Sequence, residues 1–127
     1  MRRAYVVIGW AIVLLGAIHM FATTRLFTGV TPRAVWFFSG GIAISLTGAL
    51  NLLNHAYGTG ASGLRRVCVI TNLVMAVFGA VAGMVTGATL AEQIVVLGLT
   101  GGATALSLLK RSLRPLASVG AFITDHR

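Results

Sequence analysis

Four long apolar runs make up most of this chain, and they restrict it to folds that form inside a lipid bilayer. The runs are Ala4 to Thr24, Ala34 to Asn54, Val67 to Gly87 and Leu90 to Leu109. Each has about the 20 residues that an α-helix needs to cross the hydrocarbon core. Because an unpaired backbone group is costly in lipid, such runs must be helical. The sequence therefore predicts an all-α fold, an integral membrane bundle of four helices at about 4–24, 34–54, 67–87 and 90–109.

The composition agrees with a membrane protein that has one domain. Hydrophobic residues make up 57% of the chain and charged residues only 9%, whereas soluble domains have about 25% charged residues. The stretches Thr28 to Pro32 and Tyr57 to Gly63 favour short exposed turns. These connections are too short to bury a second core, so residues 1–127 are expected to form a single domain. The first run is longer than the apolar region of a signal peptide, so we expect it to be retained as a helix.

The placement of the cations predicts the orientation. Only two arginines, Arg25 and Arg33, lie in the first connection, and the third has none. The other ends of the helices carry more, namely Arg2, Arg3, Arg65, Arg66, Lys110, Arg111, Arg114 and Arg127. Cytoplasmic segments are enriched in lysine and arginine, so both termini are expected in the cytoplasm, in the inner (plasma) membrane of a bacterium. The tail 112–127 is expected to be cytoplasmic, either lying along the surface as a basic segment or without fixed structure.

Charge, cysteine and histidine content exclude several classes of function. The formal net charge is +8, but the cations flank apolar segments and form no basic surface interleaved with aromatic residues, so no nucleic-acid partner is predicted. Cys68 is the single cysteine, which excludes an intrachain disulfide or a Cys-x-x-Cys redox pair. No metal ligand spacing is present, so no metal site is predicted and no cofactor is identified. Glu92 begins the fourth helix, where it either caps the helix dipole or pairs with His19 or Arg25.

The 16 glycines indicate close contacts between helices. Small residues share one face on each predicted helix, at the spacings expected for α-helical structure. The sets are Gly9 and Gly16; Gly41, Ser45 and Gly48; Gly79, Gly83 and Gly87; and Gly98, Gly102 and Ala105. These faces either pack against each other within the chain or contact a second chain. Their number favours a homo-oligomer, a homodimer or larger, or a complex with another membrane protein, in addition to membrane lipid as a partner.

Polar residues inside the spans are the candidate ligand-binding residues, because polar groups in lipid are costly. His19, Ser39 and Gln93 fall toward the outer face, whereas Asn51 and Asn72 fall toward the cytoplasmic face. Thr100 and Thr104 add hydroxyl groups to the fourth helix. His19 is the strongest candidate, because an imidazole can bind a metal or haem iron or act as a base. The alternative is that all these groups only form hydrogen bonds between helices.

Three functions remain open. The first is a small polytopic membrane protein that binds or passes a small polar or amphiphilic solute in a cavity between helices. The second is an accessory or assembly subunit that docks a larger membrane partner through its glycine faces. A weaker third is a lipid- or quinone-directed enzyme with His19 as base, for which no nucleophile, acid pair or metal set is present. No catalytic residue is assigned.

Overall fold

A computed structural model describes residues 1–109, and these residues are entirely helical outside short connections. The helices are α1 (Arg2–Leu26), α2 (Pro32–Tyr57), α3 (Ser62–Thr86) and α4 (Leu90–Leu108). All four are long and apolar enough to cross a membrane. The predicted fold class is confirmed to that extent, and the chain is an integral membrane protein by this criterion. The tail predicted at 112–127 lies outside the described residues.

The helix ends follow local capping chemistry. Pro32 occupies the first turn of α2, and the Thr31 side chain accepts a hydrogen bond from the Ala34 N–H at 3.1 Å. Thr89 and Glu92 form a capping box at the start of α4, which agrees with the interpretation of Glu92 as a capping residue. The third helix begins at Ser62 rather than Val67, because a helix can continue past its apolar run into the polar headgroup region.

Gly87 ends α3 in the left-handed conformation, with φ 69°. Its N–H and the N–H of Ala88 both donate to the carbonyl oxygen of Gly83. Residues with a Cβ are disfavoured in this conformation, so glycine at this position lets the chain turn directly into α4. Gly87 therefore serves the turn rather than a contact between helices.

Glycine contacts hold α1 against α2. A Cβ atom built on Gly48 would lie 2.6 Å from the backbone nitrogen of Val13 and 2.8 Å from the carbonyl oxygen of Gly9. One built on Gly41 would lie 2.9 Å from the carbonyl oxygen of Gly16. The two backbones thus approach as closely as in small-xxx-small membrane helix pairs.

The α3–α4 pair is also closely packed. A Cβ on Gly79 would lie 2.8 Å from Cγ1 of Val96, and one on Gly83 would collide with the side chain of Gln93. Within the described residues, then, the small faces of α1 and α2 and part of the α3 face are used inside the chain.

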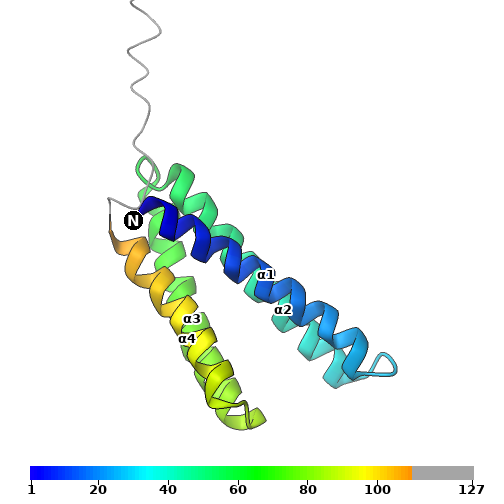
Figure 1. The fold of residues 1–127 in the computed structure, drawn as a ribbon. Helices are drawn as coiled ribbons and strands as arrows, with labels where there is room; N and C mark the ends of the chain where they lie inside the picture. The colour runs from blue at the N-terminus through cyan, green and yellow to red at the C-terminus, as the bar shows by residue number, and fades with distance from the viewer. Residues whose placement is uncertain (110–127) are drawn as a thin grey trace, which may run out of the picture.

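The helices form two antiparallel hairpins, α1–α2 and α3–α4, which meet at one end (Figure 1). The hairpins approach where α1 and α3 begin and diverge toward the α1–α2 and α3–α4 connections. Large apolar side chains cover the outside, among them Trp10, Trp36 and Val85, while asparagine, threonine and serine dominate the buried set. This inverted arrangement suits a protein whose solvent is lipid.

Substituting the glycine contact of α1 and α2 should destabilise the protein. We expect Gly48→Ala to lower the free energy of unfolding in mixed detergent micelles by about 1–3 kcal/mol, because the methyl group forces the two backbones apart. Gly101→Ala is the matched control, since no atom lies within 4 Å of its Cβ position. This control lacks the clash, so it should not destabilise the protein, and the gain in helix propensity of up to about 1 kcal/mol is common to both substitutions. Equal effects of the two substitutions would contradict the packing described.

Candidate functional site

Asn51 of α2 and Asn72 of α3 form a reciprocal amide pair at the junction of the hairpins. Asn51 Nδ2 donates to Asn72 Oδ1 at 2.7 Å, and Asn72 Nδ2 donates to Asn51 Oδ1 at 2.9 Å. Asn51 Nδ2 also donates to the Thr47 carbonyl oxygen at 2.9 Å. Both asparagines are buried, so each amide satisfies the other where lipid offers no partner.

Tyr5 extends this network to α1. Its hydroxyl donates to Asn51 Oδ1 at 2.9 Å and accepts a hydrogen bond from Asn54 Nδ2 at 2.8 Å. The Cys68 thiol on α3 donates to the same Asn51 oxygen at 3.3 Å and lies 3.6 Å from the Tyr5 hydroxyl. We call Tyr5, Asn51, Asn54, Cys68 and Asn72 the junction network. It joins three helices and both hairpins.

One acceptor of the junction network has no partner among the described residues. Asn54 is fully buried, yet no hydrogen bond within residues 1–109 reaches its Oδ1 atom. This oxygen lies next to Gly58, in the turn that leads to α3. The remaining polar atoms of the network are used within it, so its chemistry is that of a structural joint rather than an open binding site.

Sequence reasoning identified the asparagines but missed Tyr5 and Cys68. Tyr5 follows two arginines at the start of the first span, where an aromatic residue is usual at the membrane interface. The Tyr5 hydroxyl group was the one feature that could have indicated a place in the network, because a tyrosine buried among helices needs a hydrogen-bond partner. Cys68 lies one turn before Asn72 on the same helix face, and that spacing was the only indication of its place.

His19 lies at the far end of α1 in an aromatic cluster. Its ring stacks on Phe37 with a centroid distance of 3.8 Å and an interplanar angle of 16°. Phe37 in turn lies 5.9 Å from Phe27, with the rings tilted by 56°. A Cβ atom built on Gly40 would lie 3.5 Å from His19 Nε2, an ordinary van der Waals contact, so the imidazole packs against α2 without requiring glycine there. His19 is half-buried, and its ring is oriented by packing.

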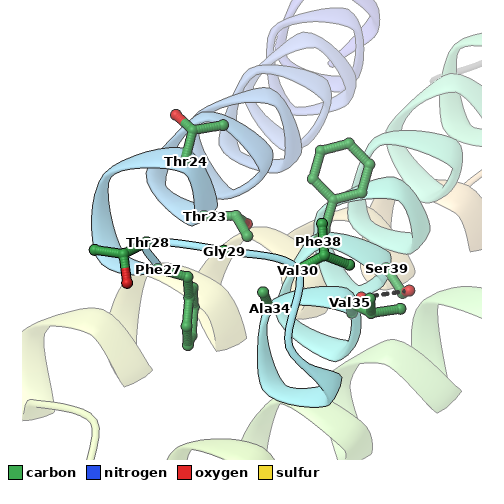
Figure 2. A pocket seen from close by; sticks show the side chains of 10 residues that line it. All are labelled: Thr23, Thr24, Phe27, Thr28, Gly29, Val30, Ala34, Val35, Phe38 and Ser39. Carbon is green, nitrogen blue, oxygen red and sulfur yellow. Dashed lines mark hydrogen bonds between the residues drawn. The ribbon is translucent and has the colours of Figure 1, made fainter.

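A groove of about 460 Å³ opens beside this cluster, at the α1–α2 connection (Figure 2). Its apolar part includes Phe27, Val30, Val35 and Phe38. Four residues that carry a hydroxyl group also line it, namely Thr23, Thr24, Thr28 and Ser39. Ser39 is one of the candidate ligand-binding residues from the sequence. Its hydroxyl group donates to the Val35 carbonyl oxygen at 2.7 Å, as the dashed line in Figure 2 marks. The groove was not foreseen, because its shape depends on the path of the connection.

The other predicted ligand-binding residues do not gather with His19. Gln93 covers Gly83 at the α3–α4 contact. The Thr100 and Thr104 hydroxyls donate to carbonyl oxygens of their own helix, each at 2.8 Å. Asn51 and Asn72 lie together in the junction network, whereas His19 and Ser39 share the opposite end of the α1–α2 hairpin.

Comparison with known proteins gives no relative from which a function can be inferred. No family model, curated protein or solved structure matches the chain. Only the residues and their geometry therefore bear on function.

Removing the Tyr5 hydroxyl should weaken the junction. Tyr5→Phe keeps the ring but leaves Asn54 Nδ2 without its acceptor, and we expect a loss of about 1–3 kcal/mol in the free energy of unfolding. Tyr57→Phe removes the same hydroxyl from a side chain that is 63% exposed, and should change stability by less than about 0.5 kcal/mol. A stability loss of the same size in both variants would show that the Tyr5 contacts contribute nothing specific.

Proposed function

We propose that this protein is a small polytopic membrane protein that binds a small amphiphilic molecule in the groove at the α1–α2 connection. The observation that carries the proposal is the groove itself, which combines an apolar wall with four hydroxyl-bearing residues. The groove has a volume of about 460 Å³ and is broadly open to its surroundings. Of the residues that the sequence analysis proposed for a solute site, only Ser39 lines this groove.

The chemistry of the lining favours a ligand with a hydrogen-bond donor at its polar end. Ser39, Thr23 and Thr24 each donate their hydroxyl proton to a carbonyl oxygen of their own helix. Each hydroxyl oxygen still has lone pairs that can accept a hydrogen bond. An alcohol or amine group of a ligand fits these acceptors, while an aliphatic portion fits against Phe27 and Phe38.

The position of the groove suits an amphiphile. It lies at the end of two spanning helices, where the hydrocarbon core gives way to the headgroup region. A ligand there can keep its polar end near the connection and its apolar part along the helices. With both termini in the cytoplasm, as the charge bias predicts, the groove would open toward the outer side of the plasma membrane.

A second candidate is an accessory subunit, or a homo-oligomer, that docks through α4. The specific observation is that a Cβ atom built on Gly98 or Gly101 would meet no atom of another helix within 4 Å among residues 1–109. These glycines therefore leave a small face free on a hairpin that diverges from its neighbour. Such a face permits close approach of a helix from a second chain.

Filling the groove distinguishes the two candidates. The protein is purified in mild detergent, and the retained small molecules are extracted and identified by mass spectrometry. Ser39→Trp should abolish retention of an amphiphile present in the wild type, because the indole occupies the groove. Thr86→Trp is the matched control, since Thr86 is also exposed and bonds the carbonyl oxygen one turn before it. It should retain the molecule as the wild type does.

Two outcomes would reject the binding proposal. One is a wild-type protein that carries no small molecule and is recovered only with a larger membrane partner, which would favour the docking candidate. The other is equal retention by Ser39→Trp and Thr86→Trp, which would place the molecule elsewhere on the surface.

A further inference from the structure

Four arginines surround the end where the two hairpins meet. Arg2 and Arg3 begin α1, and Arg65 and Arg66 lie in the second turn of α3. Both helices start at this end, next to each other, because the Tyr5 hydroxyl of α1 lies 3.6 Å from the Cys68 thiol of α3. No ion pair within residues 1–109 involves these arginines, and Arg65 is half-buried.

Arg2 and Arg65 lie on the faces that meet at the junction. Arg2 precedes Tyr5 by about one helical turn, and Arg65 precedes Cys68 by the same interval. Residues one turn apart share a helix face, so both arginines are placed beside the Tyr5–Cys68 contact, one turn nearer the membrane surface. The two cations therefore flank the junction from different hairpins.

The starts of α1 and α3 add to this positive potential. Neither helix has a side-chain cap or an acidic residue in its first turn. The helices that start at the other end differ, because Thr31 caps α2, and Thr89 with Glu92 caps α4. Uncapped N–H groups at a helix start attract anions, and here they combine with arginines. The buried Asn54 Oδ1 atom at the same end also has no hydrogen-bond partner among the described residues.

The chain itself cannot supply enough counter-charge. It has two acidic residues, of which Glu92 caps α4 at the opposite end and Asp125 lies outside the described residues. One remaining carboxylate is too few for four guanidinium groups. Because the arginines adjoin spanning helices, the anions at their depth in a cell are lipid phosphates.

From these observations we propose that the junction end binds the headgroup of an anionic phospholipid, whose phosphate bridges Arg2 of α1 and Arg65 of α3. The phosphate would join the hairpins on the membrane surface, one turn beyond the junction network. Phosphatidylglycerol carries such an anionic headgroup, whereas the headgroup of phosphatidylcholine has no net charge. This lipid site is separate from the proposed groove, which lies at the opposite end of the α1–α2 hairpin.

Binding of phosphatidylglycerol and phosphatidylcholine to the full chain in detergent tests this assignment, with bound lipid counted by native mass spectrometry. The wild type should retain phosphatidylglycerol in preference to phosphatidylcholine, and the lipid should raise the Tm. Arg2→Gln with Arg65→Gln should weaken phosphatidylglycerol binding by about tenfold or more, the effect expected for two surface cations. Arg25→Gln with Arg33→Gln is the control, with the same charge change at the other end, and should bind like the wild type.

Several results would overturn the proposal. They are equal retention of both lipids by the wild type, equal loss in the two double variants, and a rise in Tm with inorganic phosphate that matches the rise with phosphatidylglycerol. The last result would mean that the site takes a free anion rather than a lipid. If Arg2→Gln with Arg65→Gln does not fold, the single variants Arg2→Gln and Arg65→Gln are used, and each should weaken phosphatidylglycerol binding. Binding as strong as in the wild type in both single variants would overturn the proposal.

Discussion

The placement of the two hairpins depends on the reciprocal amide pair between Asn51 and Asn72. In lipid, apolar side chains gain little by leaving their surroundings for another helix, because the lipid tails are equally apolar. A pair of amides is different, since hydrocarbon offers neither a partner and each amide donates a hydrogen bond to the other. With bonds of 2.7 and 2.9 Å, this pair makes the junction the place where the hairpins are held. Tyr5 and Cys68 then converge on the same Asn51 oxygen and bring α1 into the joint.

Two kinds of contact thus stabilise different parts of the fold. Glycine contacts hold α1 to α2 over much of their length, at Gly9 with Gly48 and at Gly16 with Gly41. Hydrogen bonds hold the hairpins to each other at one end only. The hairpins diverge beyond the junction (Figure 1), so the far end of the α1–α2 hairpin is shaped by its own connection. The groove there and the basic junction end are therefore separate surfaces, for which we propose an amphiphile and an anionic headgroup respectively as ligands.

The sequence predicted the helices well because length and hydropathy alone decide which segments cross a bilayer. Depth along the helices also placed Asn51 and Asn72 in one layer, and His19 and Ser39 toward one end. Depth did not reveal which side chains of neighbouring helices face each other. The Thr100 and Thr104 hydroxyls bond their own helix, an outcome that residue type permits but does not require. Tyr5 resembled an interfacial aromatic residue, and the groove depends on a connection whose path no periodicity encodes.

A double-mutant cycle on Asn51 and Asn72 tests most directly whether the amide pair joins the hairpins. Unfolding free energies are measured in mixed detergent micelles for Asn51→Leu, Asn72→Leu and the double variant. Each single substitution removes both hydrogen bonds between the two amides but leaves the other amide buried, whereas the double substitution removes both amides. The structure predicts that the double variant is more stable than the sum of the single losses implies, by about 1 kcal/mol or more. Strictly additive losses would show that the two amides do not interact, and would contradict this description of the junction.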